Sequence, residues 1–242
     1  LKNMRIGRQL GLGFGLVLMM LVGIGLSGYW GVNSLSGATI EMLRGDGTIA
    51  EHSARARANV LGLRRYEKDL FLNIGDREKE AGYLKKWQEQ HEHLTKRLDD
   101  LAKAVSLDKE KEALRTMRTE LAAYDGGFKK VMSQIDLGKI RTPQEGNAAI
   151  SAYKDEIHKL EAAAKDLATE SNERMDQMEP HFVAQAKRTN LIMLMLAALA
   201  VILSIAIAWL ITRHITEQVG GEPAAIAALA QKVAAGDLTT VF

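Results

Sequence analysis

The chain has 242 residues and a formal net charge of +2; 26% of the residues are charged, 47% are apolar, three are proline and none is cysteine. The absence of cysteine excludes disulfides and thiolate metal sites, and it suits an oxidising compartment such as the periplasm. Few prolines and few aromatics, with abundant Ala, Leu, Lys and Glu, predict an all-α protein. Basic and acidic residues are equally numerous between Asn33 and Arg188, and without a basic stripe this balance argues against nucleic acid as a partner.

The first element in chain order is an uncharged run from Leu10 to Tyr29. A helix needs about 20 apolar residues to cross the hydrocarbon core of a bilayer, so this run is long enough. It is too long for the core of a signal peptide, and no clear cleavage site follows it. We interpret residues 10–30 as a transmembrane helix. The preceding Lys2, Arg5 and Arg8 place residues 1–9 in the cytoplasm.

Small residues recur every fourth position in this run. They are Gly7, Gly11 and Gly15, followed by Gly23, Ser27 and Gly31. The sequence Gly11–Gly15 resembles a phosphate-binding loop, but no strand precedes it. The four-residue repeat instead predicts a face for close helix packing in lipid.

Residues 31–188 carry the pattern of an antiparallel four-helix bundle. The first helix has one apolar seam at seven-residue intervals: Leu35, Met42, Ile49, Ala56, Leu63 and Leu70. We place a second, unusually polar seam of this helix at His52, Asn59, Tyr66 and Asn73. Gly75 suits the end of the first helix, and Asp76 suits the N-cap of the second.

The remaining bundle helices show apolar residues three and four positions apart. The second helix carries Leu84, Trp87, His91, Leu94, Leu98, Leu101 and Val105; the third carries Leu114, Met117, Leu121, Tyr124, Phe128, Val131 and Ile135. The fourth carries Ile150, Tyr153, Ile157, Leu160, Ala164, Leu167 and Ser171. Gly138 ends the third helix, and Thr142-Pro143-Gln144-Glu145 predicts a capping box with proline at the first helical position.

A second uncharged run, Leu191 to Ile211, predicts another transmembrane helix over residues 189–212. Only Thr189-Asn190 separates it from the fourth bundle helix, so we expect one helix from Thr142 to Ile211, loosened or kinked at Pro180. Arg213 places residues 213–242 in the cytoplasm, although Lys187 and Arg188 on the outer edge weaken this orientation. The expected fold class is therefore all-α: a periplasmic four-helix bundle flanked by two transmembrane helices in the bacterial inner membrane.

Three stretches resemble bacterial methyl-accepting chemotaxis proteins of the four-helix-bundle sensor class. Arg64–Asn73 is similar to the first-helix signature, and Tyr153–His158 resembles the matching stretch of the fourth helix. Gly220–Pro223 followed by Ala235–Leu238 resembles the first helix of a cytoplasmic HAMP signal-relay module. The second HAMP helix and the methylated cytoplasmic hairpin are absent, so we expect the natural protein to continue.

The resemblance implies particular partners. It implies a homodimer that pairs through its first helices, in contact with membrane lipid. It also implies a chemotaxis histidine kinase and a coupling protein, both reached through the cytoplasmic hairpin. The alternative is the input half of a sensor histidine kinase or cyclase, because the same bundle, spans and relay helix serve both.

Two places are candidates for ligand binding. In the first, Arg57 and Arg64 lie one step beyond the apolar seam, where they would oppose their copies across a dimer and hold an anion between them. The family's aspartate-sensing members have a ligand-binding arginine cluster on this helix. The further residues assigned to this site are Arg65, Tyr153, Lys154 and His158. A solvated, ion-paired surface is the alternative, since Glu67 lies three residues from Arg64.

The second candidate lies inside one bundle, at His91 and Asn59. Counting residues from the membrane-distal turns places Tyr66, Trp87, Phe128 and Tyr153 in one layer, with Asn59, His91, Tyr124 and Ile157 one turn lower. Buried polar groups need partners, so these side chains are expected to meet one another, water or a ligand. A polar layer that only sets helix register is the alternative.

The expected ligand is a small molecule: an organic acid, an amino acid or an inorganic anion. No nucleophile–base pair and no metal-ligand spacing stands out, so we expect no enzyme activity, no cofactor and no metal.

Overall fold

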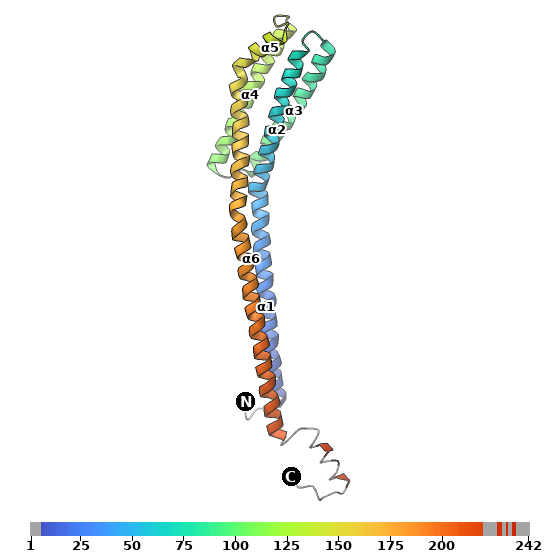
Figure 1. The fold of residues 1–242 in the computed structure, drawn as a ribbon, viewed down its shortest axis with the longest axis vertical. Coiled ribbons are helices and arrows are strands. Elements are labelled where there is room, and N and C mark those ends of the chain that lie inside the picture. Colours follow the sequence, from blue (N-terminus) through green and yellow to red (C-terminus); the bar gives the residue numbers. More distant parts are fainter. Residues whose placement is uncertain (1–5, 220–226, 229–230, 232–233, 236–242) are drawn as a thin grey trace. The chain divides into compact units, whose positions relative to one another are not determined.

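A computed structural model describes residues 6–219, 227–228, 231 and 234–235. The described residues form helices and turns without a strand (Figure 1). In chain order these are α1 (Ile6–Met42), the π-helical turn η1 (Leu43–Gly47), α2 (Thr48–Leu72), α3 (Arg77–Ala104), α4 (Asp108–Asp136), α5 (Pro143–Ile150), the 3-10 turn η2 (Ser151–Tyr153) and α6 (Lys154–Val219). The chain divides into two units: Gly37–His181, called the bundle below, and Leu1–Ser36 with Phe182–Phe242, called the helical pair.

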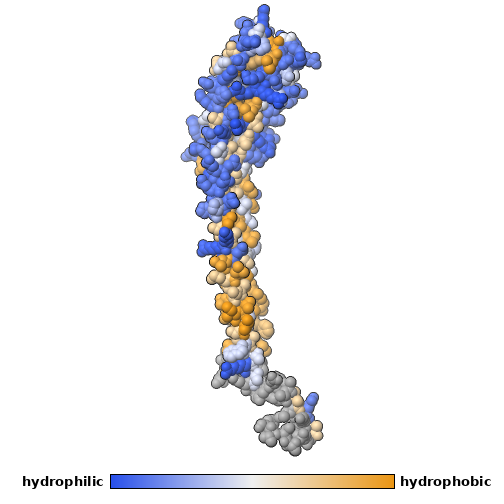
Figure 2. Space-filling view, in the orientation of Figure 1, coloured by the Kyte–Doolittle hydropathy of each residue, from blue (hydrophilic) through white to orange (hydrophobic). Residues whose placement is uncertain are grey.

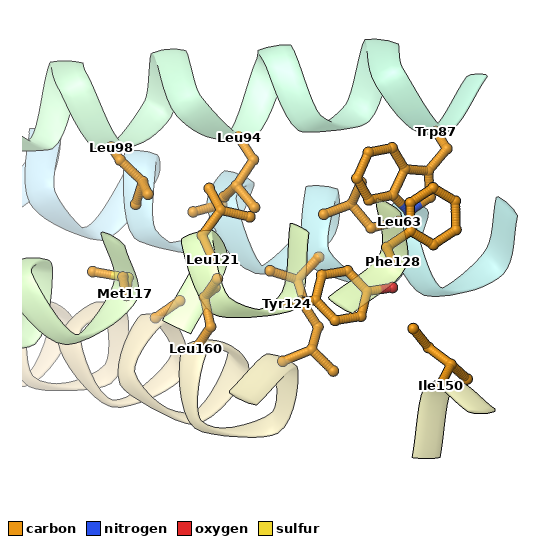
Figure 3. Close-up of a cluster of buried hydrophobic side chains, with 14 of the residues drawn as sticks. Leu63, Trp87, Leu94, Leu98, Met117, Leu121, Tyr124, Phe128, Ile150 and Leu160 are labelled. Carbon is orange, nitrogen blue, oxygen red and sulfur yellow. The ribbon is translucent and has the colours of Figure 1, made fainter. Parts of the chain in front are cut away.

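The bundle packs α2, α3, α4 and the α5–α6 segment around one apolar core. All seven apolar positions predicted for α4 are buried, as are Trp87, Leu94, Leu98 and Leu101 of α3. In Figure 3 the indole ring of Trp87 faces the phenyl ring of Phe128, and the two centroids are 4.0 Å apart. The predicted seam of α4 is therefore confirmed, as is the four-helix bundle itself. The predicted seam of α3 is confirmed at these four positions, whereas Leu84, His91 and Val105 are only half-buried.

The predicted helix ends are also confirmed. Asp76 caps α3, because its Oδ1 accepts a hydrogen bond from the Lys79 amide at 3.3 Å. Thr142 Oγ1 accepts from the Glu145 amide at 3.3 Å, and Glu145 Oε2 accepts from the Thr142 amide at 3.1 Å. Gly75 and Gly138 have φ angles of 100° and 65°, the left-handed conformation that only glycine adopts without strain.

Two helices predicted to be unbroken contain irregular turns. The first bundle helix widens into η1, where Gly45 and Gly47 flank Asp46 and weaken the preference for α geometry. The fourth tightens into η2 at Tyr153, whose ring lies against Gly127 of α4 so closely that a Cβ at Gly127 would be 2.2 Å from it. The expectation of one uninterrupted α-helix from Thr142 to Ile211 is therefore wrong at η2. Pro180 lies inside α6 without ending it.

The second seam of the first helix was predicted one residue too early. Its observed positions are Ser53, Val60, Glu67 and Ile74, of which the first three are buried and the last is half-buried. His52, Asn59, Tyr66 and Asn73 are only half-buried. One residue turns a helix by about 100°, so the shift moves the polar residues to the flank of the core and places a glutamate inside it.

The helical pair consists of the N-terminal part of α1 and the C-terminal part of α6, which run antiparallel. A Cβ at Gly31 would meet Thr189 at 2.2 Å, and one at Gly13 would meet Ile207 at 2.8 Å. Both helices are long and apolar enough to cross a membrane. Figure 2 shows hydrophobic surface over this unit and mainly hydrophilic surface over the bundle. Of the residues assigned to the HAMP-like motifs, Gly220–Pro223 and Gly236–Leu238 lie outside the described part of the chain.

Candidate functional site

The face between α2 and α6 brings together most of the predicted anion-binding residues. Arg64 Nη1 lies 2.9 Å from Nε2 of His158, and Arg57 Nε donates to Glu161 Oε1 at 3.2 Å. Both arginines project from α2 toward α6 of the same chain. The Arg57 charge is balanced by a carboxylate, whereas Arg64 contacts an imidazole.

Two lysines extend this face toward the turn between α4 and α5. The Nζ atoms of Lys68 and Lys154 both donate to Oδ1 of Asn147, at 3.4 Å and 3.2 Å. A hollow of about 250 Å³ adjoins Lys68 and is lined mainly by apolar groups, Phe71, Leu72 and Pro143 among them. Positive charge therefore lies beside apolar surface. We call Arg64, Lys68, Lys154 and His158 the basic face.

The other predicted residues of this site lie at its edges. Arg65 is exposed; its guanidinium is 3.9 Å from Asp69 and 5.7 Å from the centroid of the Tyr66 ring. Tyr153 is half-buried, and its ring packs against Gly127 rather than opening to the basic face. Of the predicted layer, Trp87 and Phe128 stack on each other in the core, and Tyr153 packs against Gly127 next to Phe128 in the chain.

Beneath the basic face lies a buried carboxylate that the sequence reasoning did not select. Glu67 is 1% exposed, and its Oε2 accepts a hydrogen bond from the Tyr124 hydroxyl. Burial raises the pKa of Glu67, while Tyr124 and the nearby charges of Arg64, Lys68 and Lys154 oppose this rise. Burial and the Glu67 charge also raise the pKa of Tyr124. The available signal was the three-and-four spacing Val60, Leu63, Glu67, Leu70, which places Glu67 on the core side.

The residues predicted inside the bundle, Asn59 and His91, are not brought together: Asn59 meets α3 from α2, whereas His91 faces α4. Asn59 Nδ2 donates to Gln90 Oε1 at 2.9 Å, and the His91 ring stacks on Trp87 with centroids 5.5 Å apart. His91 Nε2 is 3.9 Å from a carboxylate oxygen of Asp125. A hollow of about 650 Å³ between α3 and α4 is lined by Trp87, His91 and Asp125, which form the second group; Asn59 does not line it.

The two groups are separate, with one aromatic residue between them. Tyr124 bonds to Glu67 on α2, and its ring centroid is 6.3 Å from that of Trp87 on α3. The indole Nε1 of Trp87 and the Glu67 Oε1 atom are buried, and neither has a hydrogen-bond partner within the part of the chain that the structure describes. The structure thus offers two distinct places for a ligand, as the sequence did. Arg64, Lys154 and His158 lie together at one of them, and His91 lies at the other, apart from Asn59.

The described residues contain no cluster of three or more His, Asp or Glu side chains placed to hold a metal ion. The Glu67–Tyr124 pair is closed off from solvent, and the basic face combines cations with neutral partners. Such a surface binds negatively charged groups by charge-assisted hydrogen bonds.

Comparison with known proteins produced one match. A family model described as a four helix bundle sensory module for signal transduction matches residues 3–178. No curated protein and no solved structure matches the chain.

Proposed function

Because this chain belongs to the four-helix-bundle sensory modules for signal transduction, we propose that it is the input half of a two-pass transmembrane chemoreceptor. This module is found in methyl-accepting chemotaxis proteins. In the proposed arrangement the bundle lies in the periplasm, and both membrane-spanning segments lie in the helical pair. The exposed apolar side chains of the pair support this assignment, because lipid rather than water would then surround them.

The proposed ligand is a small carboxylate with an apolar body, bound at the basic face. The observation that carries this proposal is the placement of Arg64, Lys68, Lys154 and His158 on one face, with Lys68 lining the apolar hollow at Phe71. A carboxylate at Arg64 and Lys154 would accept charge-assisted hydrogen bonds, and the apolar body would fill the hollow. An inorganic anion would gain only the first of these contributions.

The same site supports a route for the signal. A ligand changes a receptor only when it binds one conformation more tightly than another. The basic face takes Arg64 from α2 and Lys154 and His158 from α6, so an anion held there would favour one position of α6 against α2. Helix α6 continues to Val219. A small shift of this helix would reach the proposed HAMP segment and a cytoplasmic kinase-control domain.

The receptor is proposed to be a homodimer in the membrane. Along one side of α1, a Cβ added at Gly7, Gly11, Gly15 or Gly23 would meet no atom within 4 Å. This side of the helix is therefore open to a second copy of the chain. The chemotaxis kinase and its coupling protein remain the proposed downstream partners. If the cytoplasmic part instead carries a kinase or cyclase domain, the same bundle serves a sensor enzyme.

Calorimetry on the full chain in lipid nanodiscs tests the ligand proposal. The probes are benzoate, succinate, aspartate and inorganic phosphate. Benzoate and succinate are expected to bind more tightly than phosphate. Arg64→Ala should weaken binding by about 1.5–3 kcal/mol, the contribution of a hydrogen bond to a charged group. Arg55→Ala is the matched control, because Arg55 is exposed on α2 and pairs with Glu51 at 2.7 Å.

Two results would contradict this site. If the Arg64→Ala variant binds as tightly as the unmodified chain, the ligand does not bind at the basic face. If His91→Ala then abolishes binding, the ligand occupies the α3–α4 hollow, which His91 lines. That hollow is the second candidate, because its volume of about 650 Å³ falls within the usual range for small-molecule sites.

A further inference from the structure

The first bundle helix contains one wide turn, η1, between α1 and α2. The carbonyl of Leu43 accepts hydrogen bonds from the Thr48 amide, five residues on, and from Thr48 Oγ1 at 3.2 Å. A π-helical turn of this kind holds one residue more than an α-helical turn, and such turns occur often at functional sites. Gly45 and Gly47 lower the cost of leaving α geometry here, but they do not select the π form.

An arginine of α6 forms an ion pair with this turn. Arg174 Nε donates to Asp46 Oδ1 at 2.7 Å, and Arg174 Nη2 lies 2.6 Å from the same oxygen. The Nη2 atom also lies 2.6 Å from Glu110 Oε1 and 3.0 Å from Ser171 Oγ. These are charge-assisted contacts in a partly buried place, where they are stronger than at an open surface.

Glu110 connects the same arginine to a third element. Its side chain is 4% exposed, and its Oε2 accepts hydrogen bonds from the amides of Ser106 at 2.9 Å and Leu107 at 3.1 Å. Glu110 thus caps α4 with one oxygen and binds Arg174 with the other. The Arg174 guanidinium joins η1, the start of α4 and α6. Without it, the carboxylates of Asp46 and Glu110 would share a confined space without a neutralising cation.

We propose that Arg174 is the latch of a one-residue register switch in the first helix. With Arg174 on Asp46, η1 keeps its π-turn. When α6 moves and draws Arg174 away, the turn relaxes to α geometry, and the residues before Leu43 shift by one position against α2. One position is about 1.5 Å along the helix and 100° around it. Shifts of about 1–2 Å are usual when helices move in signalling transitions.

This inference rests on the proposed function in one respect, the movement of α6. The latch itself is tested without any ligand, by hydrogen exchange and mass spectrometry on the full chain in lipid nanodiscs. Arg174→Gln should speed amide exchange in residues 43–48 by about tenfold or more, because without the latch this segment interconverts between the π and α registers, and each interconversion breaks its backbone hydrogen bonds. The matched control Arg55→Gln removes an exposed ion pair of α2 and should change this exchange by less than about twofold.

Exchange in the α4 core, residues 114–131, serves as the measure of intact fold. If Arg174→Gln disturbs it, Asp46→Asn replaces that variant, because it weakens the contact to η1 and leaves the Arg174–Glu110 pair in place. The same local acceleration is expected. Exchange in residues 43–48 equal to that of the unmodified chain would overturn the latch.

Deletion of Gly45 tests the register switch directly. The deletion removes the extra residue, so the helix should become α-helical through this region with the α4 core still protected. Exchange in residues 43–48 should then be slow with or without Arg174→Gln. Loss of core protection, or exchange that still depends on Arg174, would show that no second register exists. Neither result depends on the carboxylate screen, so the two proposals fail separately.

Discussion

The bundle and the helical pair hold their helices together in different ways. In the bundle, large side chains such as Tyr124, Phe128 and Leu160 are fully buried against one another. In the helical pair, large side chains such as Phe14 and Leu194 remain exposed at 68%. At Gly31 and Gly28 the backbone of α1 admits side chains of α6, Thr189 and Met193.

The difference shows which solvent each unit is built for. In water, burial of apolar surface supplies most of the stability, so the large side chains gather inside. In lipid the same side chains gain little by leaving the solvent, and close backbone approach at small residues supplies the association instead. Both kinds of packing occur along the same two helices. Helix α1 begins in the helical pair and ends in the bundle, and α6 begins in the bundle and ends in the helical pair. The following predictions test this contrast.

The largest effect is expected from shortening a buried leucine of α6. Leu160 is 0% exposed and Leu194 is 68% exposed. Leu160→Ala should lower the free energy of unfolding of the bundle by about 2–5 kcal/mol, because it leaves a cavity in the core. Leu194→Ala should lower it by less than about 0.5 kcal/mol. Urea unfolding of the full chain in nanodiscs, followed by circular dichroism, measures both; equal losses would contradict the contrast.

Neighbouring glycines of α4 provide the next test. A Cβ at Gly127 would lie 2.2 Å from the Tyr153 ring, whereas one at Gly126 would meet nothing within 4 Å. Gly127→Ala should destabilise the bundle by about 1–3 kcal/mol through overpacking. Gly126→Ala should stabilise it by up to about 1 kcal/mol through helix propensity. Thermal unfolding distinguishes the two variants. A Gly127→Ala variant more stable than the unmodified chain would show that Tyr153 in η2 moves aside at no cost in stability.

The buried carboxylate should make bundle stability depend on pH. Because burial raises the pKa of Glu67 above its ordinary value of 4.5, the folded chain holds this proton more tightly than the unfolded chain. The free energy of unfolding should therefore fall as pH rises from 4.5 through the raised pKa, and the loss is complete above it. Glu67→Gln should remove this part of the pH dependence and stabilise the bundle at neutral pH by about 1 kcal/mol.

Urea unfolding at a series of pH values measures the Glu67 effect. Glu51→Gln is the control, because Glu51 is an exposed glutamate of the same helix. A Glu67→Gln variant with the same pH slope as the unmodified chain would show that Glu67 ionises inside the bundle without cost.

The smallest effect is expected in the helical pair. The chain has no cysteine, so Ser34→Cys with Gln185→Cys, which replace side chains 2.9 Å apart, report the packing of α1 on α6. Gly31→Val should slow formation of this disulfide several-fold, because the new side chain collides with Thr189. Gly25→Val is the control, since nothing lies within 4 Å of a Cβ there. Equal rates would show that glycine does not set this approach.

Much of the bundle was predictable because its information is local. The spacing of apolar residues in α3 and α4 places the core side of each helix without reference to the others. Gly75, Asp76 and the Thr142–Glu145 box set helix ends by their own hydrogen bonds and backbone conformation. Arg64 and His158 were also selected from the sequence, but for a site between two subunits; their contact within one chain was not predicted.

The sequence by itself determined the all-helical fold and the two apolar segments, and it singled out Arg64, Lys154 and His158 of the basic face but not Lys68. Only the tertiary structure decided which flank of α2 enters the core, because seams at Asn59 and at Val60 have the same period and differ by one residue. It also decided that Arg57 and Arg64 pair with α6 of their own chain. The ion pair of Arg174 with Asp46 joins residues 128 positions apart in the chain. No local pattern carries such a pairing, since it depends on how three helices meet.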